Sequence, residues 1–429
     1  MYRVFLLLFP FFIAGQTSNE LSYATAEELS IHMPFINSKI DSIITNGIQQ
    51  KAFPGAQLLV AKDNQIIFHK TYGFHSYDSI QKVGLNDIYD LASVTKIAGP
   101  LLPLMKLYEE GKIDLDKPFS SYWTSWKHRK DKKDISLREL LAHQAGMEPY
   151  IVFLNEVLKN GKLKNRFVKS VFNKRFSNQA YASIYVKNRF KNKIFRKINR
   201  SKVSSEKTYR YSGLASLIYP TLIEEITGQS YTSYLQNHFY KPLGCSTLGY
   251  NPTSRGLKDI VPTEIDTLFR KSLVNGYVHD ENAALLGGVS GNAGLFGSAL
   301  DLAKLMQMLV QKGKYAGKRY LKETTVNEFI KVQYPDNNNR RGLGFDKPLL
   351  DNATLDITKA YPAPEVSSES FGHSGFTGTF VWADPENQMV FIFLSNRVYP
   401  TRIHHNIYNL NIRPSLQQVF YQALKEQNN

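Results

Sequence analysis

The sequence contains a single cysteine, Cys245, among its 429 residues. One cysteine excludes an intramolecular disulfide, so the fold must rest on an apolar core, for which 42% hydrophobic residues are ample. The same composition excludes a disordered protein, and no internal repeat is present. Within KPLGCSTLGY, Cys245 is better interpreted as a small buried hydrophobe than as a thiol nucleophile.

The apolar run at the start of the chain, residues 4–14 of MYRVFLLLFPFFIAGQTS, is too short to span a bilayer. It follows one positive charge, Arg3, and precedes small residues, which is typical of a secretory signal removed near residues 14–17. Cys245 is too far away to be a lipidated cysteine after such a signal. We therefore expect a signal peptide over residues 1–16 and a soluble, exported, periplasmic domain over residues 17–429.

Acidic residues are almost missing from residues 158–210, which hold 17 Lys/Arg and one acid, Glu206. The chain has 53 Lys/Arg and 37 Asp/Glu in total, so 36 of each lie elsewhere and the net charge of +16 belongs to this basic insertion. Its KNRFKNKIFRKINRSK alternates basic and apolar residues and could bind an anionic membrane or envelope polymer. The alternative is a solvated insertion of the helical lobe that lies over the site. We expect no binding of nucleic acid by an exported protein.

The order of elements predicts an α+β fold. Residues 55–74 read as a β-hairpin with its turn at 62–64, and residues 378–396 read as a second hairpin. Amphipathic helices are expected near residues 27–46 and 414–426. Because strands lie at both ends and helices between them, the ends should pair into one antiparallel sheet and the middle should pack as a helical lobe.

Local signals divide the helical middle of the chain. Pro100 and Pro103 predict a kink or a late start in the helix after Ser93. Ser136 and Ser298 are plausible N-caps. The glycine-rich LLGGVSGNAGLFGS lacks the strand and lysine of a phosphate-binding loop, so a tight turn is expected there.

Ser93 and Lys96 lie three residues apart in DLASVTKIAGP, a spacing that also occurs at Ser79/Lys82 and Ser204/Lys207. Only Ser93 sits where an extended segment passes into a helix. A helix would bring the Lys96 amine to the Ser93 hydroxyl and direct a backbone N–H at an oxyanion. An acylating serine requires this arrangement, because a hydroxyl is a weak nucleophile until a base takes its proton.

Three motifs, SVTK (93–96), YSG (211–213) and HSG (373–375), resemble in their order those of the serine β-lactamase and penicillin-binding protein superfamily. The chain is most similar to its class C β-lactamase, D-alanyl-D-alanine carboxypeptidase and esterase group. LLAHQAGM, KPLG and GHSGFTGT resemble accessory signatures of that group, and the likeness runs from about residue 36 to 400. It implies a β-lactamase/transpeptidase-like fold.

The resemblance also implies roles for individual residues. Ser93 would be the acylated nucleophile, Lys96 its proton acceptor, and Tyr211 a second acid/base for the leaving group and the deacylating water. The third motif would place His373, Ser374 and Gly375 on an edge strand facing the substrate. The backbone N–H groups of Ser93 and Phe376 would form the oxyanion hole, worth about 3 kcal/mol per donor.

Two positions depart from the family pattern. Gly213 stands where an Asn or Asp usually binds a substrate amide, and His373 stands where β-lactamases usually carry lysine. A histidine of ordinary pKa is largely neutral at pH 7, which weakens recognition of a substrate carboxylate. Both changes argue against an efficient β-lactamase.

We therefore expect a serine hydrolase acting on a small ester or amide, such as a D-alanyl peptide derived from peptidoglycan. The alternatives are a promiscuous carboxylesterase and a non-catalytic protein that binds penicillins or wall fragments, which Gly213 favours and the intact Ser93, Lys96 and Tyr211 oppose. We expect no cofactor and no metal site, since His404-His405 has no further ligands nearby. His143 is expected to be a packed, hydrogen-bonded histidine that closes a helix.

Overall fold

The computed structural model of the protein describes residues 20–25 and 33–425. The signal peptide expected over residues 1–16, and the expected start of the first helix near residue 27, lie outside these ranges. No helix within the described ranges combines the length and hydrophobicity that crossing a membrane requires.

Strands from the two ends of the chain form one six-stranded sheet in the order β1-β3-β2-β18-β17-β16. Neighbouring strands are antiparallel except β1 and β3. The predicted α+β arrangement, with a mainly antiparallel sheet from both chain ends, is confirmed. The strands are β1 (Ser22–Tyr23), β2 (Gly55–Lys62), β3 (Gln65–Gly73), β16 (Phe371–Ser374), β17 (Phe380–Asp384) and β18 (Met389–Ser395).

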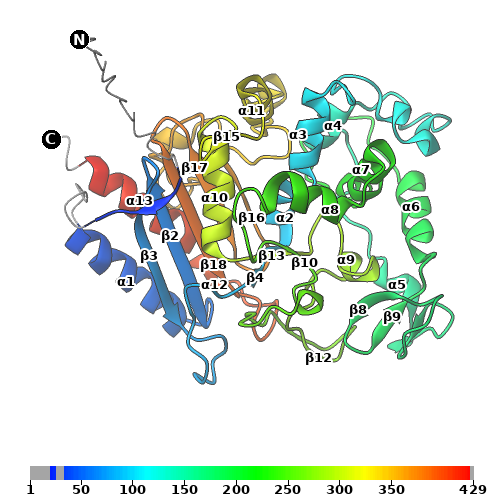
Figure 1. Ribbon diagram of the computed structural model, residues 1–429, viewed down its shortest axis with the longest axis horizontal. Helices are drawn as coiled ribbons and strands as arrows, with labels where there is room; N and C mark the ends of the chain where they lie inside the picture. Colours follow the sequence, from blue (N-terminus) through cyan, green and yellow to red (C-terminus); the bar gives the residue numbers. More distant parts are fainter. Residues whose placement is uncertain (1–19, 26–32, 426–429) are drawn as a thin grey trace, which may run out of the picture.

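Helices cover both faces of the sheet (Figure 1). On one face lie α1 (Met33–Gln49) and α13 (Ile412–Lys425), and on the other lies α10 (Ala299–Val310). The side chains of β2 alternate accordingly, because Leu58 and Val60 join the core under α1 and α13 while Leu59 joins the core under α10. Both faces of the sheet are therefore buried from solvent, which explains the nearly continuous apolar character of the central strands.

The middle of the chain forms a mostly helical lobe beside the sheet, at the right of Figure 1. Its small sheet has the order β10-β13-β4 and extends toward the central sheet. The remaining helices are α2 (Thr95–Ala98), α3 (Leu101–Glu109), α4 (Leu137–Leu141), α5 (Leu154–Val157), α6 (Phe190–Arg200), α7 (Tyr219–Thr227), α8 (Tyr231–Leu235), α9 (Glu281–Leu285), α11 (Glu323–Ile330) and, near α13, α12 (Asn406–Asn409). The short strands are β4 (Tyr89–Asp90), β10 (Gly249–Tyr250), β13 (Leu295–Gly297) and the hairpins β11 (Ile265–Asp266)–β12 (Ser272–Leu273) and β14 (Lys314–Tyr315)–β15 (Lys318–Arg319).

The local signals of the sequence correspond to element boundaries. The helix after Ser93 is interrupted as predicted, since α2 ends at Ala98 and α3 starts at Leu101 after Pro100. Ser136 accepts a hydrogen bond from the backbone N–H of Glu139, whose side chain bonds back in a complete capping box. The Ser298 hydroxyl caps α10 by accepting a hydrogen bond from the backbone N–H of Asp301, so both predicted N-caps are confirmed.

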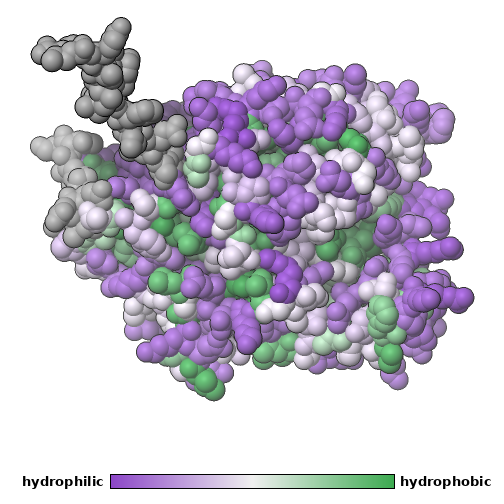
Figure 2. Space-filling view, viewed as in Figure 1, coloured by the Kyte–Doolittle hydropathy of each residue, from purple (hydrophilic) through white to green (hydrophobic). Residues whose placement is uncertain are grey.

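The basic insertion, residues 158–210, folds as part of the helical lobe. It contains α6 and the short strands β5 (Leu158–Lys159), β6 (Lys162–Leu163), β7 (Val168–Lys169), β8 (Asn178–Tyr181) and β9 (Ile184–Val186). Phe190, Ile194 and Ile198 of α6 are buried in the main core, so the apolar face of this helix is already covered. Hydrophilic side chains project from the edge of the lobe where α6 and β9 lie (Figures 1 and 2).

Candidate active site

Ser93 lies in a single 3-10 turn, Ala92–Val94, between β4 and α2. The Lys96 Nζ atom donates to Ser93 Oγ at 2.9 Å and to the backbone carbonyl of Asn292 at 3.0 Å. Lys96 is only 7% exposed, whereas the residues of the Ser79/Lys82 and Ser204/Lys207 pairs are all exposed. Burial against a second element thus distinguishes the pair at Ser93 from the two other matches.

The turn that presents Ser93 is strained and is held from two sides. Ala92 has a φ of +44°, a left-handed conformation that costs a non-glycine residue about 1 kcal/mol. Its N–H donates to the Asp90 side chain at 2.9 Å. The hydroxyl groups of Thr377 and Thr379 donate to the carbonyls of Asp90 (2.7 Å) and Leu91 (3.2 Å). The segment after the third motif therefore fixes the backbone that carries Ser93.

Tyr211 reaches the same serine from the second motif. Its hydroxyl donates to Ser93 Oγ at 3.2 Å, and the Lys96 Nζ atom lies 5.2 Å from its ring centroid. The guanidinium of Arg341, which is 1% exposed, lies 5.7 Å from the same ring. The structure thus brings Ser93, Lys96 and Tyr211 into one cluster and adds a buried cation that the motifs do not indicate.

The cluster sets the acidity of Tyr211. Burial by itself raises the pKa of its phenol, but the charge of Lys96, hydrogen bonding with Lys96 and Ser93, and the charge of Arg341 outweigh burial and hold the pKa below its usual value of 10. Arg341 is fixed by Asp346 at 3.0 Å. Tyr211 is therefore a stronger acid than an ordinary buried tyrosine, and its phenolate forms at lower pH.

His143 packs against this cluster. It follows α4, its ring centroid lies 4.5 Å from that of Tyr211, and its Nδ1 accepts from the backbone N–H of Ser212 at 3.3 Å. Burial, then the charges of Arg341 and Lys96, depress its pKa well below 6.5. The expected packed, hydrogen-bonded histidine is confirmed, and its packing partner is Tyr211.

The third motif places an uncharged histidine beside Tyr211. His373 Nδ1 lies 2.7 Å from the carbonyl oxygen of Ser374, so Nδ1 is the protonated nitrogen and Nε2 carries a lone pair. Burial, then the charges of Arg341 and Lys96, depress the pKa of His373 well below 6.5. Within the described part of the chain, the buried Nε2 atom has no hydrogen-bond partner. His373 can therefore accept a hydrogen bond but cannot offer a cation to a carboxylate.

Gly375 and Phe376 bring the third motif against the nucleophile. A Cβ atom at Gly375 would lie 2.6 Å from the carbonyl of Leu91, so only glycine allows this approach. Phe376 is 46% exposed and lines a cavity with Ser93. Among the described residues, its backbone N–H has no hydrogen-bond acceptor, which leaves it free for the oxyanion role that the resemblance implies.

Asn292 lies beside the position where the second motif lacks a side chain. A Cβ atom at Gly213 would meet only Asn292 Cβ, at 3.9 Å. The Asn292 amide accepts from the Ser290 hydroxyl at 2.7 Å and donates to Asp280 at 3.2 Å. An amide side chain is therefore present beside Gly213 in the cavity that Ser93 lines, although it comes from the glycine-rich turn and not from the motif.

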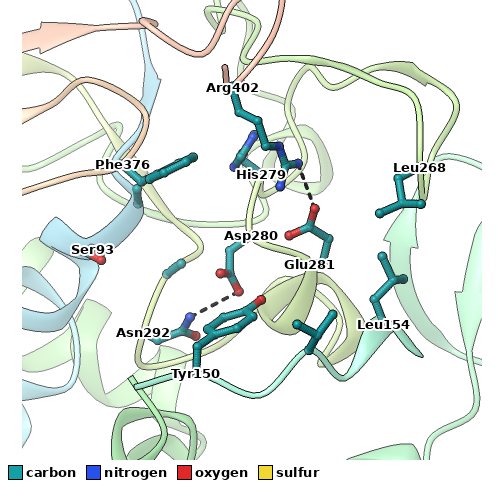
Figure 3. Close-up of a pocket in the computed structure, with 13 residues that line it drawn as sticks. Ser93, Tyr150, Leu154, Leu268, His279, Asp280, Glu281, Asn292, Phe376 and Arg402 are labelled. Carbon is teal, nitrogen blue, oxygen red and sulfur yellow. Dashed lines mark hydrogen bonds and ion pairs between the residues drawn. The ribbon is translucent and has the colours of Figure 1, made fainter. Parts of the chain in front are cut away.

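A cavity of about 410 Å³ opens on Ser93 (Figure 3). One part of its wall is apolar or aromatic and another part is charged. Its lining comprises Ala92, Ser93, Tyr150, Val152, Leu154, Leu268, His279, Asp280, Glu281, Asn292, Ala293, Phe376 and Arg402. The cavity lining includes no residue of the basic insertion, 158–210, so the expectation that the insertion lies over the site stays a prediction.

Several residues of this site carry no recognisable signal in the sequence. Asn292 was hidden in a glycine-rich turn, and Arg341 lies in NNNRRGLG, which matches no motif. Asp280 reads only as a helix N-cap before α9. Tyr150 follows LLAHQAGM closely enough that the accessory signature could have drawn attention to it. The described residues contain no group of three or more His, Cys, Asp or Glu side chains arranged to hold a metal ion.

This fold, together with a buried lysine that donates a hydrogen bond to an accessible serine, defines the class of protein. It is a serine hydrolase of β-lactamase/transpeptidase-like architecture. The chain belongs to the beta-lactamase family, whose model matches residues 40–412. A Salmonella typhimurium protein provisionally named a D-alanyl-D-alanine carboxypeptidase is 30% identical over 403 residues, covering 88% of this chain and 85% of the relative.

Solved structures share the fold at lower identity. EstCE1, a hydrolase with promiscuous acyltransferase activity, has a TM-score of 0.63 at 18% identity, covering 89% of this chain and 98% of its own. The class C beta-lactamase of Rhodobacter sphaeroides has a TM-score of 0.62 at 14% identity, covering 89% of this chain and 99% of its own. These likenesses establish the architecture, and the chemistry has to be argued from the site.

Proposed function

We propose that the protein is an exported hydrolase that forms an acyl-enzyme at Ser93 and hydrolyses a small amide or ester, with D-alanyl cell-wall peptides as the substrate class. One observation carries the proposal: Ser93 Oγ is contacted by both Lys96 Nζ and the Tyr211 hydroxyl at the mouth of the 410 Å³ cavity. The provisional name of the Salmonella relative supports the substrate class.

The reaction needs one base near Ser93. Lys96 and Tyr211 together supply it, either as neutral amine and phenol or as ammonium and phenolate, because one proton is shared between coupled groups. Ser93 Oγ attacks the carbonyl carbon while its proton passes to this pair, and the oxyanion is held by the backbone N–H groups of Ser93 and Phe376. The pair then protonates the leaving group, and water, deprotonated by the same pair, releases the acyl group and restores Ser93.

A carboxylesterase is the second candidate, and the neutral His373 favours it. A carboxypeptidase must recognise the terminal carboxylate of its substrate, and His373 offers a lone pair in place of a cation. Turnover of short acyl p-nitrophenyl esters and of D-alanyl-D-alanine peptides by the purified enzyme separates the two candidates. Hydrolysis of the peptides supports the peptidase, and hydrolysis of esters alone supports the esterase. A protein that is acylated by penicillin but turns over neither class would be the non-catalytic binder.

We propose in addition that the basic insertion docks the enzyme on an anionic membrane or envelope polymer. Lys193, Arg196, Lys197 and Arg200 line a groove of about 570 Å³ that also contains Glu148 and Glu156. Since the apolar face of α6 is buried, such binding would rest on charge. Sedimentation with phosphatidylglycerol-containing vesicles should fall as salt rises from low ionic strength, and binding that is insensitive to salt would contradict the proposal.

The proposed export is tested by determining where the chain recovered from its host begins. Residues 1–16 are expected to be absent from protein recovered in the periplasmic fraction, which mass spectrometry of that fraction would reveal. Recovery of the chain with its first 16 residues intact, in the cytoplasm, would contradict export.

A further inference from the structure

The wall of the cavity opposite the nucleophile is acidic, although the chain as a whole is basic. Most of its charge is neutralised locally. Arg402 pairs with Glu281 at 2.8 Å and with Glu264 at 2.5 Å, and His279 contacts Glu264 at 2.9 Å. This network lies behind and beside the cavity, with Arg402 and Glu281 joined by an ion pair in Figure 3.

Asp280 is the exception in this wall. Its Oδ1 accepts from the backbone N–H of Ala283 at 2.8 Å and from Asn292 Nδ2 at 3.2 Å. Its Oδ2 has no hydrogen-bond partner, and no basic side chain lies within 4 Å, among residues 20–25 and 33–425. The cavity therefore contains a fixed carboxylate with one oxygen and one negative charge uncompensated.

Tyr150 completes the surroundings of this carboxylate. Its ring lies on the same side of the cavity as Asp280 and Asn292 (Figure 3), and it is a partly exposed lining residue. Burial raises the pKa of the Tyr150 phenol most, and the negative charges of Asp280 and Glu281 raise it further. The two carboxylates therefore lie close enough to Tyr150 to act on its hydroxyl. A carboxylate beside an exposed aromatic face is the combination that binds ammonium groups.

The position of the cavity relative to Ser93 indicates which half of the substrate it holds. The leaving group must lie near Lys96 and Tyr211, which protonate it, and neither residue lines the cavity. The cavity extends from Ser93 past Asn292 to Asp280 and Tyr150. It therefore receives the acyl half of the substrate.

We propose that this cavity selects substrates that carry a primary ammonium group on the acyl half, with Asp280 as its counter-ion and Tyr150 as its aromatic neighbour. The apolar wall of Val152, Leu154 and Leu268 would hold the adjoining aliphatic or aromatic side chain. The ammonium could be the free α-amine of an amino acid amide or ester, or a side-chain amine of a longer peptide. The inference rests on the acyl-enzyme function proposed above.

The test compares matched substrates on wild-type enzyme and on Asp280→Asn. Asparagine keeps the shape and is an equally good N-cap for α9, so the variant removes the charge with little structural change. The substrates are D- and L-alanine p-nitroanilide, their N-acetyl forms, and Nα-acetyl-lysine p-nitroanilide. Asp134→Asn, whose side chain is 78% exposed, makes the same charge change elsewhere on the surface.

The readout is the ratio of kcat/KM for each amine-bearing substrate to kcat/KM for N-acetyl-alanine p-nitroanilide, which does not depend on the fraction of folded enzyme. Wild-type and Asp134→Asn enzymes should favour an amine at least about tenfold, and Asp280→Asn should lower that ratio about tenfold. Preference for the alanine substrates identifies an α-amine, and preference for the lysine substrate identifies a side-chain amine. The α-amine preference should fade above about pH 8, where that amine loses its proton.

A ratio near one in wild-type enzyme, or a ratio that Asp280→Asn leaves unchanged, would overturn the proposal. If no anilide is turned over, the corresponding alaninamides and lysinamides are used as competitors of fluorophosphonate labelling at Ser93, with the same expected ratios of inhibition constants. Labelling also separates the two proposals. Labelled Ser93 without amine preference contradicts only the ammonium site, whereas unlabelled Ser93 contradicts the acyl-enzyme function itself.

Discussion

The cavity at Ser93 and the basic insertion are neighbours with opposite character. Residues 150–157 adjoin both, because Tyr150 and Leu154 line the cavity while Ile151 and Glu156 line the basic groove. The insertion contains 17 basic residues, yet its groove cations lie at the surface. The cluster around Ser93 contains two buried basic side chains, Lys96 and Arg341, and both lower the pKa of Tyr211. Burial, more than the number of charges, therefore determines where a charge can shift the pKa of a neighbouring group.

The same substitution in the two regions should have very different consequences. Lys96→Met removes the amine that contacts Ser93 Oγ, and we expect kcat to fall about 10³-fold, within the range for loss of a general base. Lys169→Met, on an exposed position of the insertion, should leave kcat within about twofold. Steady-state kinetics on one ester substrate measures both. Equal losses in the two variants would contradict the contrast.

Glu264 and Glu156 allow a buried ion pair to be compared with one whose lysine partners lie nearer the surface. Each has a pKa of about 2 in the folded protein: burial opposes this shift for Glu264 but His279 and Arg402 outweigh it, whereas Lys193 and Lys197 lower the pKa of Glu156. A folded pKa below the unfolded value of 4.5 stabilises the protein above about pH 4.5, and that stability is lost as the pH falls toward 2. For the buried Glu264 the gain is about 3 kcal/mol at pH 7.

Urea unfolding of Glu264→Gln and Glu156→Gln at pH 7 and pH 3 measures this difference. Glu264→Gln should destabilise the protein at pH 7 and much less at pH 3. Glu156→Gln should have a smaller effect at both values, since water screens its lysine partners. A larger loss at pH 3 than at pH 7 for Glu264→Gln would show the opposite sign and refute the assignment.

The stability of the basic insertion should depend on one polar contact more than on its charges. Asn199 of α6 accepts hydrogen bonds at 2.9 Å from the indole N–H groups of both Trp123 and Trp126. Asn199→Leu leaves two indole donors without an acceptor and should cost about 2 kcal/mol of unfolding free energy. Asn192→Leu, on an exposed position of the same helix, is the control. Equal stability of the two variants in urea unfolding would show that the contact is unimportant.

The smallest expected effect concerns the acidity of Tyr211. Arg341→Met removes a cation that lowers the pKa of Tyr211, so the ascending limb of the pH–rate profile should move to higher pH. Asp346 keeps Arg340 as a partner at 2.8 Å, which limits the structural damage. Arg175→Met, at an exposed position of the insertion, should leave the limb unchanged. A profile that does not move in Arg341→Met would exclude this cation from the control of Tyr211.

The parts of the fold that the sequence predicted are those with strong local signals. The β2–β3 and β17–β18 hairpins follow from β-rich runs around polar turns, and the caps at Ser136 and Ser298 follow from short-range hydrogen bonds. The three ordered motifs were sufficient to bring Ser93, Lys96 and Tyr211 together. Their catalytic roles stay predictions.

What the sequence could not provide depends on packing between distant segments. Asn292 reaches the space beside Gly213 only because the glycine-rich turn folds against the second motif. Arg341 meets Tyr211 across 130 residues of chain, with no motif of its own. The alternation in α6 predicted an amphipathic helix, but not that its apolar face would be covered by the core of the same chain.

The central claim is that Ser93 is the acylated nucleophile. Intact-mass spectrometry of the purified protein after exposure to a fluorophosphonate, with Ser93→Ala as the control, tests it most directly. We predict one adduct per wild-type molecule and none on the variant. An adduct that persists on Ser93→Ala, or no adduct on the wild-type protein, would contradict the claim.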